Sequence, residues 1–248
     1  MYDSYINIIS FLITTMLYYV SLKPNPTIDT YTNKTQTHQY MYSHYFYLVV
    51  YVVLVIGVQC IVNASILSAK CGGDIDANFR TASTQTIVPW LLIFGVLAVM
   101  LVMFPGFKSV FSDIFGYYYV SHATGKLLTQ LMSCEEIEQS LVTDTAMPSE
   151  KRNSLEAVSD VIGNICHNTS MVINHMVPSN FSDYWKMLTP LMKPEYQMGD
   201  NVVLRDELFH LIVTRDNIGE AMWYVYTGIV LIYIVQMNLV CQPITASV

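Results

Sequence analysis

Three long stretches without a charged residue dominate this sequence. They are Tyr45 to Leu67, Ile87 to Phe104 and Ala221 to Val240. A helix needs about 20 mainly apolar residues to cross the hydrocarbon core of a bilayer, because each residue adds only about 1.5 Å. A charged side chain at the centre of such a helix costs about 2.5–3.5 kcal/mol on insertion scales. Each stretch is therefore predicted to be a transmembrane helix.

A fourth apolar stretch, Tyr5 to Leu22, lies near the N-terminus. It is short and carries the polar side chains of Asn7, Ser10, Thr14 and Thr15. A secretory signal peptide is the alternative interpretation. A signal peptide normally begins with basic residues and ends at a small-x-small cleavage site, whereas this segment begins with Asp3 and has no such site. The pattern favours an uncleaved membrane anchor.

The composition agrees with a membrane protein. Charged residues make up 12% of the chain and hydrophobic residues 53%, whereas soluble domains carry about 25% charged residues. We expect an all-α, multi-span helical membrane protein with three or four transmembrane helices and a small helical extramembrane domain. The expected divisions are an anchor at 1–22, a loop at 23–44, a transmembrane hairpin at 45–107, the extramembrane domain at 108–220, and a last span with its tail at 221–248.

Apolar residues recur at helical spacing within the extramembrane region. They predict helices near His122–Val142, Leu155–Ile165 and Val202–Asp216, and an apolar face over Phe181–Leu188. The helix near 202–216 is placed to continue straight into the last span.

The ends of the spans carry turn and interface residues. Pro105-Gly106 is expected to stop the third span, and Cys71-Gly72-Gly73 to make a tight turn after the second. The loop from Ser68 to Thr86 is then short, and the middle two spans form an antiparallel hairpin. Tyr and Trp favour the headgroup level, which we expect for six aromatic residues: Tyr45, Tyr47, Trp90, Trp223, Tyr224 and Tyr226.

The basic residues predict the orientation. With four spans, the loop at 23–44 and the domain after Lys108 share one side. That side holds Lys23, Lys34, Lys108, Arg205 and Arg215 near the span ends, against Lys70 and Arg80 on the other. Lys and Arg are enriched on the cytosolic side, so we expect a cytosolic domain and both termini opposite. The four N-x-S/T sequences, at Asn33, Asn63, Asn168 and Asn180, should then carry no glycan.

The sequence contains no recognisable catalytic, cofactor-binding or metal-binding pattern, so no enzyme is expected. His167 and His175, with Cys166 adjacent, are too far apart along a helix to share one zinc ion. Asp74 and Asp76 lack the remaining ligands of a calcium loop. Phe115-Gly116-Tyr117 is only faintly similar to a potassium filter. The intramembrane polar residues Gln59, Asn63, Gln236 and Asn238 are expected to join helices by hydrogen bonds.

The net charge argues against a nucleic-acid-binding protein, and the cysteines argue against a disulfide-stabilised fold. A net charge of −7 disfavours nucleic acid as a partner, because nucleic acid is bound through Lys and Arg. The five cysteines, Cys60, Cys71, Cys134, Cys166 and Cys241, form no disulfide framework by their number or spacing. We expect free, mostly buried thiols, and pairing of Cys71 with Cys241 stays open.

Several motifs, taken in order, resemble membrane proteins of large icosahedral DNA viruses, such as the giant viruses and chlorella viruses. They are C-G-G-D-I at 71–75, T-I-V-P-W-L-L-I-F-G-V-L at 86–97, F-P-G-F-K at 104–108, F-S-D-I-F-G-Y at 111–117, R-D-N-I-G-E at 215–220 and M-W-Y-V-Y-T-G-I at 222–229. Together these stretches cover roughly half of the chain. It does not include the N-terminal span or much of Cys134 to Lys193.

This resemblance implies a structural role in the virion. It implies a transmembrane minor capsid protein of the viral internal membrane, which derives from host endoplasmic reticulum and is tied to the icosahedral capsid. The partners would be the lipid bilayer, other minor capsid proteins and the major capsid protein, with no cofactor and no small-molecule substrate. The alternatives are a viral membrane channel or transport component, and a fusion factor that acts when the virus enters a cell.

Overall fold

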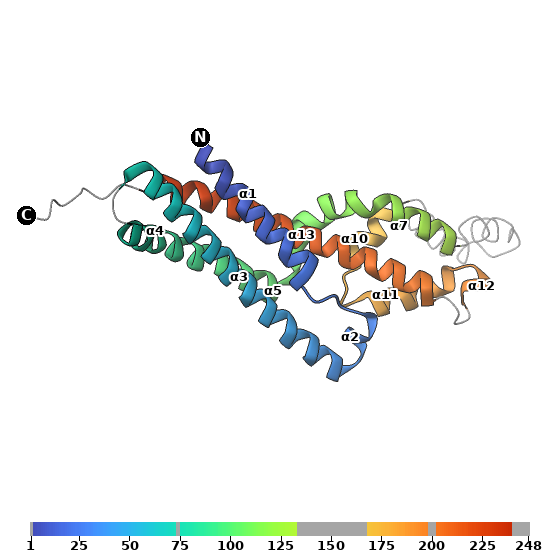
Figure 1. Ribbon diagram of the computed structural model, residues 1–248. Coiled ribbons are helices and arrows are strands. Elements are labelled where there is room, and N and C mark those ends of the chain that lie inside the picture. The colour runs from blue at the N-terminus through green and yellow to red at the C-terminus, as the bar shows by residue number, and fades with distance from the viewer. Residues whose placement is uncertain (1, 73–74, 133–167, 198–201, 240–248) are drawn as a thin grey trace, which may run out of the picture. The chain divides into compact units, whose positions relative to one another are not determined.

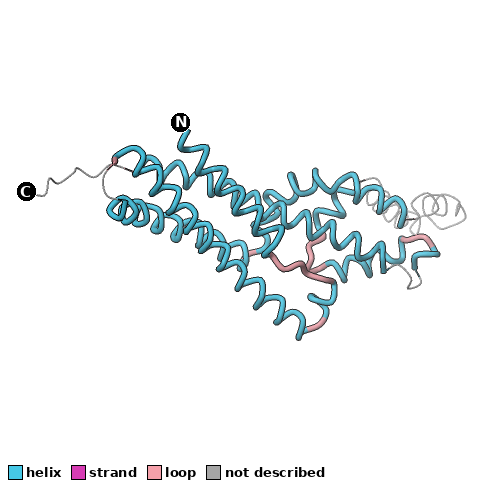
Figure 2. Tube along the Cα trace, in the orientation of Figure 1, coloured by secondary structure: helices cyan, strands magenta, loops and turns pink. Residues whose placement is uncertain are grey.

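The chain is helical throughout the part that the structure describes. The computed structural model describes residues 2–72, 75–132, 168–197 and 202–239. These residues form helices and connecting loops with no strand, apart from one isolated bridge between Met132 and Met192 (Figures 1 and 2). The expected all-α fold is confirmed.

Four helical segments are long and apolar enough to cross a membrane. They are Tyr5–Leu22, Lys34–Cys71, Asp76–Met103 and Val202–Asn238. The first consists of α1 (Tyr2–Leu17) and a π-helical turn (Tyr18–Leu22). The third consists of α4 (Ile75–Pro89), a π-helical turn (Trp90–Gly95) and α5 (Val96–Met103). The π turn directly follows Pro89, whose missing N–H interrupts the α-helical hydrogen bonds. The chain is therefore a multi-span helical membrane protein with four candidate spans.

Two of the helices extend well beyond the stretches that the sequence predicted. α3 (Lys34–Cys71) has 38 residues, or roughly 57 Å at 1.5 Å per residue, against about 30 Å of hydrocarbon. α13 (Val202–Asn238) joins the helix expected near 202–216 to the last span, so that the predicted continuation is confirmed. These helices carry the chain out of the apolar layer without a break.

The loop expected from Ser68 to Thr86 is almost entirely helix, and this prediction was wrong. α3 continues to Cys71 and α4 begins at Ile75. The reversal needs so few residues because Gly72 has a φ of +61°, a conformation that costs glycine little. The third span stops after Met103, and Pro105–Lys108 form a 3-10 turn, which confirms the predicted stop at Pro105-Gly106.

Contacts divide the chain into two compact units. Unit 1 comprises 1–25, 38–108 and 220–248, and unit 2 comprises 26–37 and 109–219. Unit 1 holds the apolar parts of all four candidate spans. Unit 2 combines most of the region after Lys108 with a piece of the loop between the first two spans. Residues 26–37 and 109–219 thus pack into one unit, which is compatible with the expectation that four spans place them on the same side.

The core of unit 1 is aromatic. Tyr51 and Phe94 lie 5.9 Å apart between ring centroids, and both contact Tyr224, at 5.4 and 5.3 Å. Trp90 lies 5.6 Å from Phe11 and 5.2 Å from Phe94. Trp90 and Tyr224 are completely buried, so the prediction that they sit at the headgroup level was wrong. Their rings fill the space between the helices instead.

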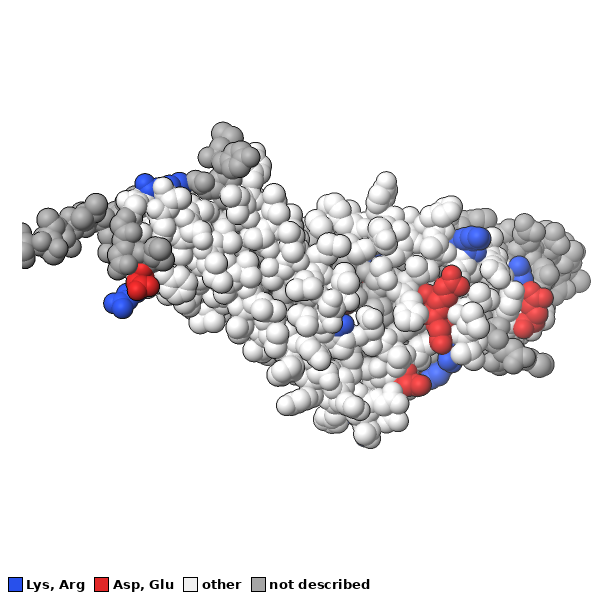
Figure 3. Space-filling model, viewed as in Figure 1, with Lys and Arg blue, Asp and Glu red and all other residues white. Residues whose placement is uncertain are grey.

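The outer surface of unit 1 is apolar. Large hydrophobic side chains are exposed along every candidate span, among them Ile13, Val53, Leu92, Val99 and Met237. Figure 3 shows almost no charged atoms on the visible face of α1 and α3, apart from the end where α3 meets α4. An exposed apolar surface of this extent is what contact with lipid requires.

Unit 2 is built from short helices around one apolar core. They are α2 (Ile28–Thr32), α6 (Ser109–Phe111), a π turn (Ser112–Gly116), α7 (Tyr117–Leu131), α10 (Thr169–His175), α11 (Phe181–Leu188), a 3-10 turn (Thr189–Leu191), α12 (Pro194–Gln197) and the first half of α13. Leu128, Ile173, Phe181 and Ile212 are buried together at its centre.

The helices of unit 2 partly match the prediction. The apolar face over Phe181–Leu188 is α11, as expected. The helix expected near 122–142 begins earlier, at Tyr117, and is described to Leu131; its remainder and the helix expected near 155–165 lie outside the described residues. The loop piece contributes α2, and its Tyr31 ring contacts Phe209 of α13 at 6.3 Å between centroids.

Candidate functional site: buried ion pairs and polar contacts that join the helices

One carboxylate in unit 1 pairs with two lysines. The Nζ atom of Lys23 lies 2.6 Å from Oε1 of Glu220, and the Nζ atom of Lys108 lies 2.6 Å from Oε2. The side chains are almost wholly buried, with exposed fractions of 5% for Lys23, 13% for Lys108 and 2% for Glu220. Both oxygens of the carboxylate thus bind an ammonium group in a region with little water.

The three charged residues come from different helix ends. Lys23 directly follows the π turn that ends the first span, and Lys108 ends the 3-10 turn after the third span. Cations are favoured at helix C-termini, where the last carbonyl groups carry partial negative charge. Glu220 lies within α13 and binds both cations. The pairs therefore fix the ends of the first and third spans against the last span.

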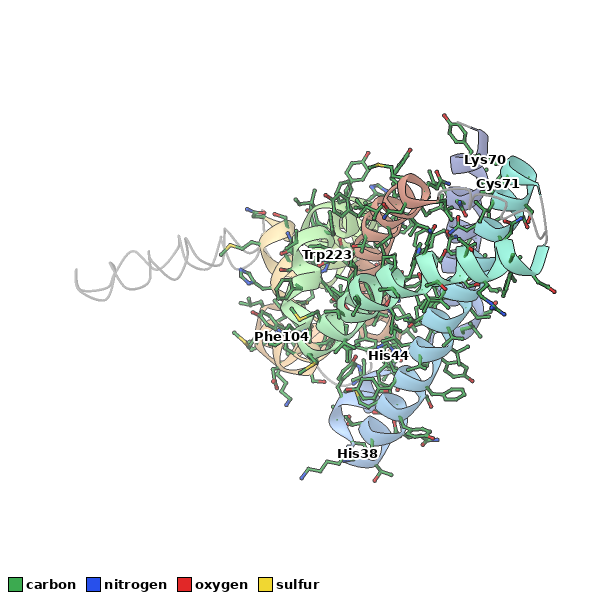
Figure 4. All side chains as sticks on the ribbon, turned by 90° about the vertical axis from the view of Figure 1, so that its left-hand side faces the viewer. His38, His44, Lys70, Cys71, Phe104 and Trp223 are labelled. Carbon is green, nitrogen blue, oxygen red and sulfur yellow. The ribbon has the colours of Figure 1, made fainter. Side chains whose placement is uncertain are left out.

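Two further hydrogen bonds strengthen the same junction. The hydroxyl of Tyr19 donates to Oε1 of Glu220 at 3.1 Å, and the ammonium of Lys23 lies 4.8 Å from the centre of the Tyr19 ring. The indole N–H of Trp223 donates to the backbone carbonyl of Phe107 at 2.8 Å. Figure 4 labels Trp223 and also Phe104, the residue that directly follows the third span. The F-P-G-F-K turn is thus held directly by α13.

A second buried charge organises unit 2. The Arg215 side chain is 1% exposed. Its guanidinium donates to the backbone carbonyl of Ile173 and to Oδ1 of Asn174 at 3.4 Å, and lies 3.8 Å from Oδ1 of Asp113. Gly116 packs against the same residue, since a Cβ atom at Gly116 would lie 2.5 Å from the carbonyl oxygen of Arg215. Only glycine fits at this contact.

A polar network links three helices inside the apolar part of unit 1. The Asn7 amide donates to Oδ1 of Asn63 at 2.8 Å, and the Asn63 amide donates to the hydroxyl of Thr86 at 2.9 Å. The Gln59 amide donates to the Asn7 carbonyl and the Ser10 hydroxyl, both at 3.3 Å. These contacts join α1, α3 and α4, which confirms the expected role of Gln59 and Asn63. The same role for Gln236 and Asn238, which lie near the end of α13, stays a prediction.

The structure describes only some of the residues that the sequence offered as candidate metal or ion ligands. His175 ends α10, whereas Cys166 and His167 lie outside the described residues. Asp76 lies in the first turn of α4, and Asp74 also lies outside them. Among residues 2–72, 75–132, 168–197 and 202–239, no three His, Cys, Asp or Glu side chains come together as a metal site. Phe115 to Tyr117 are helical, unlike the extended backbone of a potassium filter.

The cysteines differ from the expectation at one position. Cys60 is a buried free thiol, as predicted. Cys71 is disulfide-bonded, so the prediction of free thiols was wrong there. The remaining cysteines lie outside the described residues. Figure 4 shows Lys70 and Cys71 together at one end of α3, with His38 at the other end. The disulfide is thus at the C-terminal end of α3, the end from which the chain turns into α4.

The sequence did not identify the ion pairs of Glu220. In the sequence, Lys23 and Lys108 served only to predict the orientation of the chain. One signal could have indicated the pairing: Lys23, Lys108 and Glu220 each border an apolar span, which would place them at a similar membrane depth. Chemically, the arrangement contains paired cations and a paired carboxylate with no activated nucleophile beside them. It is suited to holding helices together.

Comparison of the chain with protein-family models, with curated proteins and with solved structures finds no match. The resemblance to viral membrane proteins therefore depends on the sequence motifs alone.

Proposed function

We propose that this chain is a structural virion protein, a transmembrane minor capsid protein that anchors an internal viral membrane to an icosahedral capsid. The observation that carries the proposal is that residues of the motifs shared with viral membrane proteins contact one another in the folded chain. Lys108 of F-P-G-F-K pairs with Glu220 of R-D-N-I-G-E, and Gly116 of the F-S-D-I-F-G-Y motif packs on Arg215. The motifs that resemble such proteins are thus the ones that hold each unit together.

The architecture suits an anchor. Unit 1 offers lipid a wide apolar surface, and its helices are fixed by buried polar contacts rather than arranged around a reactive group. Unit 2 adds a helical platform with its own core. A protein that ties a membrane to a shell needs these two parts: one that stays in the bilayer and one that offers a surface to other proteins. In our proposal, unit 2 binds other minor capsid proteins or the major capsid protein.

The disulfide supports the proposed orientation. Unit 2 faces the cytosol if the excess of Lys and Arg decides the topology. Cys71 then lies on the opposite side, in the lumen of the endoplasmic reticulum, which is an oxidising compartment where disulfides persist. Capsid assembly on the cytosolic face of such a membrane would bring the shell next to unit 2.

The alternative functions have less support. A channel or transport component needs polar side chains along a pathway, but Gln59 and Asn63 are engaged in hydrogen bonds between helices. A fusion factor would need unit 2 on the outside of a released membrane, contrary to the orientation that the basic residues predict. Ion conductance in planar bilayers that is lost on changing Gln59 or Asn63 would favour the channel instead.

Cross-linking of purified virions tests the proposal. We expect cross-links from lysines of unit 2, such as Lys126, Lys186 and Lys193, to capsid proteins. Lys70, on the opposite side of the membrane, is the matched control and should give none. We also expect detergent to release the protein only after the capsid has been opened. Recovery of the protein in a host membrane fraction, with none in virions, would refute the proposal.

A further inference from the structure

The disulfide of Cys71 lies at a turn that is fixed by its own hydrogen bonds. Cys71 is the last residue of α3, and Gly72, with its positive φ, directly follows it. The backbone N–H of Gly72 donates to the carbonyl of Ser68 at 3.1 Å, and the side-chain amide of Asn78 in α4 donates to the carbonyl of Gly72 at 2.9 Å. Cys71 is therefore held in a defined position between α3 and α4, and the sulfur of its partner has to reach this turn.

The end of the last span packs at the same place. Cys71 and Leu239 both pack against one small buried cluster of α3 and α4, made up of Ala64, Leu67 and Ala82. Leu239 directly follows α13 and continues its hydrogen bonding, since its N–H donates to the carbonyl of Val235 at 3.0 Å. Figure 1 shows the end of α13 beside the turn from α3 to α4. The end of the last span and the disulfide-bonded cysteine thus meet within unit 1.

A further cysteine follows this contact closely in the chain. Cys241 comes two residues after Leu239. An extended chain covers at most about 3.3–3.6 Å per residue, so the Cα atom of Cys241 stays within about 7 Å of the Cα atom of Leu239. The Cα atoms of a disulfide lie about 4.4–6.8 Å apart. Because Leu239 and Cys71 pack against the same cluster, Cys241 is within reach of Cys71 without any movement of α13.

The other cysteines are less suitable partners. Cys60 is a free thiol. Cys134 and Cys166 fall in unit 2 by their numbers, whereas Cys71 and Cys241 both fall in unit 1. Along the chain, one candidate span lies between Cys71 and Cys134, and two lie between Cys71 and Cys241. If all four spans cross the membrane, only Cys241 returns to the side of Cys71.

We propose that Cys241 is the disulfide partner of Cys71, and that the bond fastens the C-terminal end of the last span to the hairpin of the second and third spans. The oxidant is the disulfide of a thiol–disulfide oxidoreductase in an oxidising compartment. One cysteine thiolate attacks this disulfide, and the other then displaces the enzyme from the mixed disulfide. Two electrons and two protons pass from the two thiols to the enzyme, whose disulfide is reduced to two thiols.

The bond completes a clamp on the last span. Glu220 binds Lys23 and Lys108 near one end of this span, and Cys241 follows the other end. From Glu220 to Asn238 the helix rises by roughly 27 Å at 1.5 Å per residue, close to the hydrocarbon thickness of about 30 Å. The buried ion pairs and the disulfide thus hold opposite ends of the same membrane-crossing segment. The inference concerns unit 1 alone and does not depend on the virion role.

Peptide mapping of the full chain tests the pairing. Membranes that carry the protein are treated with N-ethylmaleimide, which blocks free thiols, and are then digested without reduction by trypsin and chymotrypsin. Cleavage after Lys70 and Phe79 releases the Cys71 peptide. Cleavage after Leu239 releases the Cys241 peptide. Mass spectrometry should find these two peptides joined before reduction and separate after it.

Serine variants supply the controls. In Cys241→Ser, Cys71 should become a free thiol that carries N-ethylmaleimide, whereas Cys134→Ser and Cys166→Ser should leave the linked peptides intact. Cys71→Ser, Cys241→Ser and the double variant should all lose the same several degrees of Tm, because each removes the same bond.

Other linkages would overturn the inference. They are a Cys71 peptide joined to the peptide of Cys134 or Cys166, and a Cys71 peptide joined to the same peptide of a second chain. Losses of Tm that add up in the double variant would also contradict the pairing. The peptide map uses the wild-type chain, so it does not require any variant to fold. The virion cross-links of unit 2 lysines are a separate measurement, so failure of one proposal leaves the other testable.

Discussion

Removing the Glu220 carboxylate should destabilise the membrane bundle more than any other single charge change. In Glu220→Gln, Lys23 and Lys108 remain buried, with exposed fractions of 5% and 13%, and lose a carboxylate 2.6 Å away. At an effective dielectric constant of about 20, one such pair is worth roughly 6 kcal/mol before desolvation is subtracted. Removal of one partner from a buried ion pair typically lowers the free energy of unfolding by about 3–5 kcal/mol, and we expect a loss of this size for Glu220→Gln.

Thermal unfolding in detergent micelles or bicelles measures this loss. At about 2–4 °C per kcal/mol for a chain of this size, Tm should fall by at least about 6 °C. Asp183→Asn is the control, because Asp183 and Lys186 form an exposed pair with 80% and 77% of their side chains in solvent. Exposed pairs contribute little, so Tm should stay unchanged.

A triple variant separates charge from shape. Lys23→Met, Lys108→Met and Glu220→Leu together remove all three buried charges and keep apolar side chains in their place. Replacing a whole buried ion cluster by apolar residues is often neutral or stabilising. We expect the triple variant to unfold near the wild-type temperature. A wild-type Tm for Glu220→Gln, or a triple variant as unstable as Glu220→Gln, would refute the reasoning.

Three other changes test the remaining contacts by the same unfolding assay or by gel mobility. Gly116→Ala should lower the free energy of unfolding by about 1–3 kcal/mol, because the new Cβ meets the carbonyl of Arg215. The control Gly125→Ala, which has open space around the new Cβ, should raise it by up to about 1 kcal/mol. Equal effects of the two substitutions would contradict the packing of Gly116 on Arg215. Asn63→Leu should lower the free energy of unfolding by roughly 1–3 kcal/mol, since it removes two hydrogen bonds between helices. An unchanged Tm would show that the polar network of unit 1 is dispensable for stability. Cys71→Ser should abolish a disulfide seen on non-reducing gels or by mass spectrometry, and a wild-type Cys71 that reacts with maleimide before reduction would contradict the disulfide.

Hydropathy was sufficient to predict the spans but not their ends. The bilayer selects uncharged stretches, so Tyr45–Leu67 and Ala221–Val240 could be recognised directly. Helix formation continues into polar flanks wherever the backbone hydrogen bonds can be made, which is why α3 begins at Lys34 and α13 at Val202. The turn at Gly72 could be predicted from glycine, but its brevity could not.

The placement of aromatic residues was predicted only in part. Tyr45 and Tyr226 are exposed, as a headgroup position requires. Trp90 and Tyr224 have the same position relative to span ends, yet they are buried against Phe94. Whether an aromatic ring faces lipid or the core depends on which face of its helix packs against other helices. The sequence pattern does not specify which helices are neighbours, so it could not predict the burial of these rings.

The ion pairs could not be predicted for the same reason. Lys23 and Glu220 are 197 residues apart, and only the packed bundle brings them together. The hydrogen-bonding role of Asn63 could be predicted in kind, because an amide inside an apolar helix needs a partner. Its partners, Asn7 and Thr86, became known only from the arrangement of the helices.

Protease mapping in sealed microsomes tests the central claim, that four helices cross the membrane and leave unit 2 on the cytosolic face. Protease added from outside should cut the region between Lys108 and Glu220, and the hairpin from α3 to α5 should remain as a protected fragment that resists carbonate extraction. Protection of the 109–219 region until detergent is added would contradict the orientation. Release of the intact chain into the carbonate supernatant would contradict the membrane-spanning fold itself.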